Sequence, residues 1–174
     1  MDLGLKDKKV LITGGSKGIG LACAKAFIAE GAKVALVSRS QSNLDAAKRS
    51  VGSAYVVAAD LIDASSAAAM VEKAEKKFGP IAVLVNSAGA AKGPDADDLT
   101  PAAWRASMDA KYFTYINVID PLIKKMGQRG NGVVINIIGS GGKVASPTHL
   151  SRGAAQAAVV VGAGASRGAG GHGL

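Results

Sequence analysis

The chain has 174 residues, of which 48% are hydrophobic, and it carries a formal net charge of +8 with a single cysteine, Cys23. This length is typical of one domain with a substantial core, and one cysteine excludes an internal disulfide framework. No apolar run is long enough to span a bilayer, and the first residues lack the apolar segment of a signal peptide. We therefore expect a single domain that resides in the cytoplasm and contacts no membrane.

The charges are unevenly distributed along the chain. All 13 acidic residues lie at or before Asp120, and the rest of the chain carries six basic residues and no acidic one. A basic surface of this kind can bind a nucleic acid, face the solvent without a partner or form a pocket for an anionic cofactor. Aromatic residues make up only 4% of the chain and do not interleave with basic ones as in proteins that stack bases. We therefore do not favour a nucleic-acid partner.

Strands and helices alternate along the chain from Lys9 to about Asn136. Short apolar runs predict five strands, at residues 10–12, 33–38, 55–59, 81–85 and 133–138. The helical spacing of apolar residues, together with capping and helix-terminating residues, predicts a helix after the first strand and further helices at residues 41–51, 64–78, 100–126 and 152–161. Asp63 and Thr100 are expected N-caps, and Gly31 marks a helix end. Repeated strand–helix–strand units predict a doubly wound α/β fold with a parallel sheet and helices on both faces.

The first strand runs into the sequence Thr13-Gly14-Gly15-Ser16-Lys17-Gly18-Ile19-Gly20, a glycine-rich turn that opens a helix. Glycine lacks a Cβ, which allows a tight turn and the close approach of a ligand. The helix that follows has no acidic residue in its first turn, so its N-terminus is suited to a phosphate group. We therefore predict a dinucleotide-binding turn that contains Gly14, Ser16, Lys17, Gly18, Ile19 and Gly20.

The end of the second strand bears on the choice between NAD and NADP. Ser38 and Arg39 follow this strand, and no acidic residue occurs there before Asp45. A site that selects NAD usually has an acidic residue at this place, whereas an arginine accommodates the 2′-phosphate of NADP. Lys17 can reach the same region, so two cations would surround one ribose. This pattern predicts NADP(H), although Arg39 can also be read as a solvated loop residue.

Two further strand ends carry motifs, Asp60-Leu61 after the third strand and Asn86-Ser87-Ala88-Gly89 after the fourth. Together with the T-G-x-x-x-G-x-G turn, they resemble the cofactor-binding half of the short-chain dehydrogenase/reductase family over residues 9–89. The resemblance implies a Rossmann-type sheet with strand order 3-2-1-4-5. It also implies that Asp60 accepts from the adenine amino group and that the small residues Ala88 and Gly89 let a ribose lie close to the backbone. Asn86 can hold neighbouring strand ends together through its amide, and Asp60 can instead be a turn residue.

The resemblance does not extend to the family's catalytic residues. The family uses a serine after strand five, a Y-x-x-x-K pair on the next helix and an asparagine on the preceding long helix. The tyrosine protonates the carbonyl oxygen of the substrate, and the lysine lowers the pKa of that tyrosine. In the matching register these four positions hold Gly139, Arg152, Gln156 and Lys111.

Other residues of the chain offer partial replacements. Ser140 stands one position after Gly139 and can still hydrogen-bond a carbonyl, so it is our candidate catalytic residue. His149 can donate a proton near neutral pH. Lys111 and Tyr115 are one helical turn apart and can interact. For each of these residues the alternative is a solvated or packed side chain without a role in the chemistry.

We therefore expect a Rossmann domain over residues 1–161, without the last two strands of the family, and an irregular glycine-rich tail over residues 162–174. The resemblance implies an NADP(H)-dependent oxidoreductase that acts on a small carbonyl or alcohol substrate without a metal. The missing tyrosine and lysine favour the alternative, an NADP(H)-binding protein that reduces carbonyls poorly or not at all. Apolar residues on the long helix favour a homo-oligomer formed through Trp104, Met108, Tyr112 and Ile116.

Overall fold

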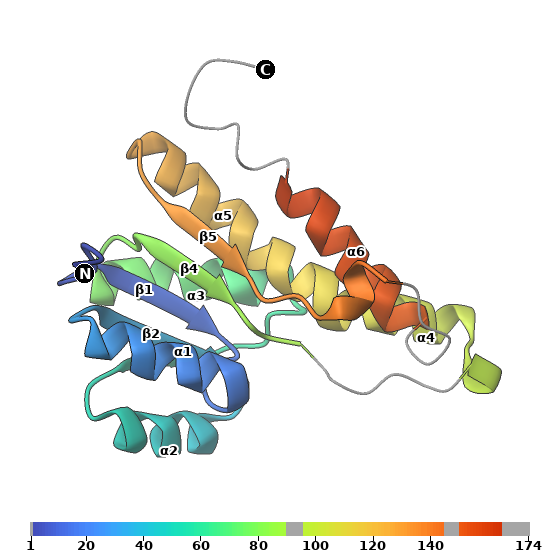
Figure 1. Ribbon diagram of the computed structural model, residues 1–174, viewed down its shortest axis with the longest axis horizontal. Helices are drawn as coiled ribbons and strands as arrows, with labels where there is room; N and C mark the ends of the chain where they lie inside the picture. The colour runs from blue at the N-terminus through green and yellow to red at the C-terminus, as the bar shows by residue number, and fades with distance from the viewer. Residues whose placement is uncertain (1, 90–95, 145–149, 165–174) are drawn as a thin grey trace.

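The computed structural model describes residues 2–89, 96–144 and 150–164. Five strands form one parallel sheet in the order β3-β2-β1-β4-β5, and helices lie on both faces of it (Figure 1). The predicted fold class and strand order are therefore confirmed. The strands are β1 (Lys9–Thr13), β2 (Lys33–Ser38), β3 (Tyr55–Ala58), β4 (Val83–Asn86) and β5 (Val133–Asn136).

In the described ranges, six α-helices and three short helical segments connect and follow the strands. The α-helices are α1 (Gly18–Ala29), α2 (Gln41–Val51), α3 (Ala64–Phe78), α4 (Pro101–Met108), α5 (Thr114–Gln128) and α6 (Leu150–Gly164). The short segments are the 3₁₀-helices η1 (Ala96–Asp98) and η3 (Ser140–Gly142) and the π-helical turn η2 (Asp109–Phe113). Among the residues that the structure describes, no helix is both long and apolar enough to cross a membrane.

Alternate residues of the central strands point to opposite faces of the sheet. Leu11 and Leu84 belong to a core cluster with α3 and α5, whereas Val10 and Val83 belong to a second cluster with α1 and α2. All four side chains are nearly or fully buried. The continuous apolar runs of the sequence therefore reflect strands that are covered on both faces.

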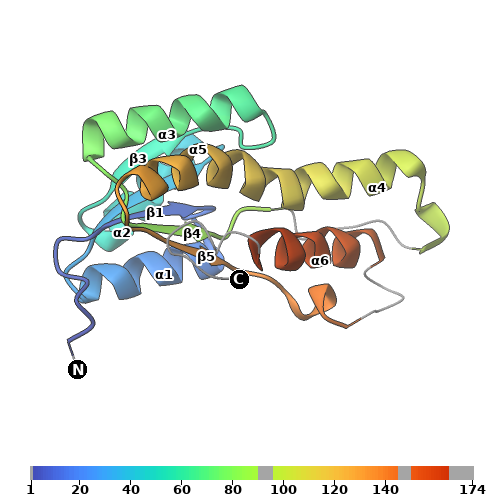
Figure 2. The same cartoon turned by 90° about the horizontal axis from the view of Figure 1, so that it is seen from above.

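The long helix predicted at residues 100–126 contains an interruption. Thr100 caps it as expected and accepts a hydrogen bond from Ala103 N at 3.2 Å. The helix then passes through the π-helical turn η2 before it continues as α5 to Gln128. Figure 2 shows α4 and α5 in one continuous line, with α6 alongside the α4 half. The Ser107 and Ser151 hydroxyls, 2.8 Å apart, join α4 to α6.

Several other predicted boundaries differ from the structure by one to three residues. Strand β4 starts at Val83 rather than residue 81, because Ile81 N donates to the Glu75 side chain instead of a neighbouring strand. Strand β5 ends at Asn136 rather than residue 138, where the chain turns into η3. Helix α6 continues past residue 161 to Gly164, and Gly162 there lies against the Tyr112 ring. The rest of the predicted tail lies outside the described residues.

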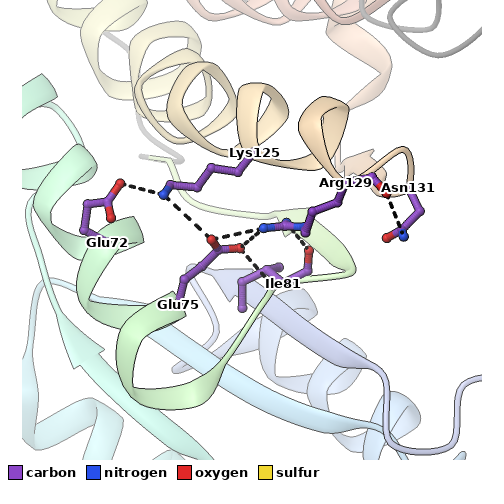
Figure 3. A network of polar contacts seen from close by, with 6 residues as sticks. All are labelled: Glu72, Glu75, Ile81, Lys125, Arg129 and Asn131. Atoms are coloured by element: carbon purple, nitrogen blue, oxygen red, sulfur yellow. Dashed lines mark hydrogen bonds and ion pairs between the residues drawn. The ribbon is translucent and has the colours of Figure 1, made fainter.

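A polar network ties α3 to the end of α5 at the amino-terminal side of β4 (Figure 3). The Glu75 side chain is 13% exposed, accepts from Ile81 N at 2.9 Å and lies 3.0 Å from Arg129 Nη1. Arg129 Nη2 also donates to Ile81 O at 3.0 Å. Lys125 bridges Glu72 and Glu75, and its hydrogen bond to Glu72 raises the Lys125 pKa. This network fixes the helices at the sheet edge opposite the strand ends that carry the motifs.

Candidate functional site

Three polar side chains join the carboxyl ends of the neighbouring strands β1, β4 and β5. Thr13, Asn86 and Asn136 are register partners in the sheet. Thr13 Oγ1 donates to Asn86 Oδ1 at 3.2 Å, and Asn86 Nδ2 donates to Asn136 Oδ1 at 3.0 Å. The backbone N–H groups of Ser87 and Ala88 donate to Thr13 Oγ1 at 3.2 and 3.3 Å. The predicted role of the Asn86 amide is thus confirmed, and Thr13 and Asn136 are additional members of this network.

The glycine-rich turn packs directly on the loop that follows β4. Gly14 has a φ of +64°, and a Cβ there would lie 2.8 Å from both Ala88 N and Ser87 O. A Cβ on Gly20 would collide with the Gly14 carbonyl oxygen. Gly18 has a φ of +53° but no atom within 4 Å of the place of its Cβ. Gly14 and Gly20 are therefore required by packing, whereas Gly18 borders open space.

The N-terminus of α1 lacks the side-chain cap that α2, α3 and α4 have. Ser40, Asp63 and Thr100 each accept a hydrogen bond from a backbone N–H in the first turn of α2, α3 and α4. Lys17, the N-cap of α1, makes no such bond, and the first turn of α1 contains no acidic residue. Ile19 in this turn is 63% exposed. The first N–H groups of α1 and the positive end of the helix dipole are therefore open to an anion.

The end of β2 lies against the same turn. Gly15 N donates to Val37 O at 3.2 Å, and Ser16 Oγ donates to Ser38 Oγ at 3.1 Å. Lys17 and Arg39 each follow one of these two serines in the sequence and are exposed, so both residues lie at the same edge of the sheet. Two cationic residues thus flank the region between the helix N-terminus and the end of β2.

The loop after β3 is held by a residue that the sequence did not single out. Asn117 of α5 donates through Nδ2 to Leu61 O and Ile62 O, both at 3.0 Å. Asp60 is exposed and accepts from Ile62 N at 3.1 Å, as in an Asx turn. The Leu61 side chain is 4% exposed and belongs to the core, so only its main chain is left for contact with a ligand.

Near the end of β5, Gly139 lies against Gln156 of α6. A Cβ on Gly139 would be 2.8 Å from Gln156 Oε1, and one on Gly142 would be 3.1 Å from the Gln156 backbone. Gln156 Oε1 is buried and has no hydrogen-bond partner among residues 2–89, 96–144 and 150–164. Ser140 is exposed at the start of η3, and His149 lies outside the residues that the structure describes. The positions that match the family's serine and lysine are therefore adjacent, with neither residue present.

Lys111 and Tyr115 form a contact beside these strand ends. Lys111 Nζ donates to Tyr115 Oη at 2.6 Å, to Ile137 O at 3.2 Å and to Ala88 O at 3.4 Å. Tyr115 is fully buried, and its hydroxyl donates to Ile137 O at 2.8 Å. Burial lowers the pKa of Lys111 to about 8 and raises the pKa of Tyr115 above its ordinary value. The predicted interaction of this pair is therefore present, and it links the loops after β4 and β5.

The residues predicted at the strand ends thus lie along one edge of the sheet, with Gly89 beside Lys111 and the glycine-rich turn on Ala88. Within the described part of the chain, no group of three histidine, cysteine, aspartate or glutamate side chains is placed to hold a metal ion. The carboxyl edge of a doubly wound sheet is where such folds bind their ligands.

Comparison with known proteins agrees with this geometry. The sequence profile described as "short chain dehydrogenase" matches residues 8–165. The chain is 35% identical over 153 residues to the uncharacterized oxidoreductase YvrD of Bacillus subtilis, covering 86% of this chain and 58% of that protein. It is 34% identical over 164 residues to an NADP-dependent (R)-specific alcohol dehydrogenase of Lentilactobacillus kefiri, covering 89% of this chain and 63% of that protein. The chain therefore spans about 60% of the length of these relatives.

A solved structure with the same fold has an active site described as unusual. It is the NADPH-bound short chain oxidoreductase of Pseudomonas aeruginosa PAO1 "containing an atypical catalytic center", with a TM-score of 0.82 and 26% identity. The match covers 88% of this chain and 63% of that structure. The profile match, the relatives and the sheet topology agree, and the chain belongs to the short-chain dehydrogenase family.

Proposed function

We propose that the chain binds NADP(H) along the carboxyl edge of the sheet and transfers hydride between the nicotinamide and a carbonyl or alcohol carbon. The observation that carries the proposal is the uncapped N-terminus of α1, with open space at Gly18 and the cationic side chains of Lys17 and Arg39 beside it. A dianionic pyrophosphate supplies the cap that this helix lacks. The relative from L. kefiri, named as an NADP-dependent alcohol dehydrogenase, supports the same assignment.

The residues at the strand ends fit the parts of a dinucleotide. We assign the pyrophosphate to the turn of Gly14, Ser16, Gly18, Ile19 and Gly20. We assign the adenosine half to the ends of β2 and β3, with Ser38, Arg39 and Lys17 at the 2′-phosphate and Asp60 and the main chain of Leu61 at the adenine. The nicotinamide ribose is assigned to the loop of Asn86, Ala88 and Gly89.

The preference for NADP(H) over NAD(H) follows from charge. Arg39 and Lys17 are exposed at the edge next to Ser38, and the nearest acidic residue after β2, Asp45, accepts a hydrogen bond from Gln41 at 2.8 Å. A phosphate gains charge-assisted hydrogen bonds there, and residues 38–44, which follow β2 in the described part of the chain, include no carboxylate to accept from a 2′-hydroxyl.

When bound, the cofactor supplies the hydride, and the chain's own residues must bind the carbonyl oxygen and protonate it. Ser140 is exposed at the start of η3 and is our candidate to hydrogen-bond the carbonyl. The second candidate function is cofactor binding without turnover. Gly139 favours it because it has no hydroxyl, Arg152 because it stands where the family has its proton-donating tyrosine, and Gln156 because it carries no charge.

The test is a titration with NADPH and with NADH, followed by NADPH oxidation with a panel of aldehydes, ketones and quinones. We expect NADPH to bind more tightly by about 1–3 kcal/mol, or roughly 5- to 150-fold in Kd. Oxidation of NADPH with any member of the panel supports the first function. Tight binding without oxidation supports the second, and an absence of NADPH binding overturns both.

A further inference from the structure

The π-helical turn η2 brings Lys111 to the edge of the sheet where the chemistry of this family takes place. π-Helical turns occur mostly as single insertions in α-helices, frequently at functional sites. The aliphatic part of Lys111 passes close to Gly89, where a Cβ would lie 2.9 Å from Lys111 Cδ. The ammonium thereby contacts the loops after β4 and β5 at once.

One of the three Lys111 N–H groups is held weakly. The contacts with Tyr115 Oη and Ile137 O, at 2.6 and 3.2 Å, are ordinary hydrogen bonds, whereas 3.4 Å to Ala88 O is longer than the usual range. An ammonium has three donors and no acceptor. Two donors therefore fix the amine in place beside the loops after β4 and β5, and the third is left for a ligand oxygen.

The surroundings of Lys111 favour release of a proton. No carboxylate in the described part of the chain forms an ion pair with it, and burial lowers its pKa to about 8. The other charged side chains on the surrounding elements are Arg105 of α4, Asp109 of η2, Lys143 after η3, Arg152 of α6, and Asp120, Lys124 and Lys125 of α5. Both acids, Asp109 and Asp120, are exposed, and Asp120 pairs with Lys124. A donor whose pKa lies near the working pH is the most effective general acid. Tyr115 cannot replace it, because the Tyr115 proton is committed to Ile137 O in the core.

We propose that Lys111 is the proton donor of this site, in place of the tyrosine that position 152 lacks; this rests on the function proposed above. In the reduction, the carbonyl carbon accepts hydride from the reduced nicotinamide, and a C–H bond forms as the carbonyl π bond breaks. The carbonyl oxygen takes a proton from Lys111 Nζ, so an O–H bond forms and an N–H bond breaks. The amine is left neutral, held by Tyr115 and Ile137, and regains a proton from water.

Two substitutions separate a proton donor from a fixed charge. Lys111→Met removes both, whereas Lys111→Arg keeps the charge but cannot release a proton. We expect both variants to lose about 10²–10⁴-fold in the rate of NADPH oxidation and to keep binding NADPH. Lys124→Met is the matched control, because Lys124 is on the adjoining helix α5, is 67% exposed and pairs with Asp120 on the surface. This control should oxidise NADPH at the wild-type rate.

A second readout does not depend on turnover. In protein labelled with [ε-¹³C]lysine, the NMR signal lost in Lys111→Met identifies this side chain. We expect that signal to titrate near pH 8 in the wild-type chain and to shift when NADP⁺ is added. The titration itself is measured on the wild-type protein, and Lys111→Arg, which keeps the positive charge, supplies the assignment where Lys111→Met fails to fold.

The outcomes separate this proposal from the function on which it rests. Wild-type rates in Lys111→Arg or Lys111→Met overturn the role of Lys111 and leave the oxidoreductase function intact. NADPH binding without any oxidation in the wild-type chain also overturns it, as does a signal that titrates at the ordinary lysine pKa and ignores NADP⁺. An absence of NADPH binding overturns the proposed function itself.

Discussion

Two glycines of the same turn provide a test of how the site is built. Gly14 and Gly18 both have positive φ angles, +64° and +53°, so an alanine at either position carries a backbone strain of about 1–2 kcal/mol. At Gly14 the added Cβ also meets the backbone of Ser87 and Ala88 at 2.8 Å, and relief of such overpacking costs about 1–3 kcal/mol more. We therefore expect Gly14→Ala to lower the free energy of unfolding by about 2–5 kcal/mol and Gly18→Ala by about 1–2 kcal/mol.

Urea unfolding measures the stability of each variant, and NADPH titration measures its affinity for the cofactor. Gly18→Ala should fold but bind NADPH weakly, because its methyl group enters the open space at the α1 N-terminus. Gly52→Ala is the control, since Gly52 has a φ of +80°, has no atom near the place of its Cβ and lies at the end of α2, away from the turn. This variant should have the same backbone strain as Gly18→Ala but bind NADPH with the wild-type affinity. Equal losses of stability for Gly14→Ala and Gly18→Ala, or wild-type affinity in Gly18→Ala, would refute the division of roles within the turn.

Four further substitutions test the charge of the site and of the fold. Arg39→Asp should reverse the preference from NADPH to NADH in parallel titrations, and an unchanged preference would contradict the 2′-phosphate assignment. Between pH 8 and 10.5 the unfolded chain binds more protons at Lys111 than the folded chain, because burial lowers the folded pKa from 10.5 to about 8. The free energy of unfolding of the wild-type chain should therefore rise relative to that of Lys111→Met over this pH range. A difference between the two free energies, measured by urea unfolding, that stays constant with pH would argue against the burial of a charged amine. Glu75→Ala should lower the free energy of unfolding by about 2–4 kcal/mol, since it removes the carboxylate that pairs with Arg129 and accepts from Ile81 N. Replacement of the exposed Glu72 by alanine should cost less than about 1 kcal/mol in the same assay, and equal effects would refute the network's role.

The sequence predicted the parts of the fold that depend on local chemistry. The sheet order, the caps at Asp63 and Thr100 and the helix end at Gly31 all agree with the structure. The π-helical turn η2 was not predicted, because the residues that define it contact strand ends more than 20 positions away, as Lys111 does with Ile137. Contacts between distant segments decide such features, and hydrophobic periodicity does not record them.

The candidate site was predicted in outline, and the residues that support it were missed. Thr13 and Asn136 flank Asn86 across three strands, and a search for polar residues at matching strand ends would have found them. Asn117 had no such signal, because its contacts with the loop after β3 follow from the packing of α5 on the sheet. Helix α6 continues past the helix end predicted at residue 161, and the residue composition gave no sign of the contact between Gly162 and the Tyr112 ring.

The four positions that depart from the family's catalytic set depend on one another. A serine at position 139 would bring its Cβ to 2.8 Å from Gln156 Oε1, so Gly139 and Gln156 accommodate each other. With Gln156 neutral, α6 supplies no lysine to lower the pKa of a tyrosine at position 152, and a tyrosine alone would keep a pKa too high for efficient donation. Under the proposal made for Lys111, the cation and the acid are instead combined in one residue on η2, held by Tyr115. Restoring any single family residue therefore adds one part of a mechanism whose other parts are absent, and the Gly139→Ser change alone also disturbs the contact between the β5 loop and α6.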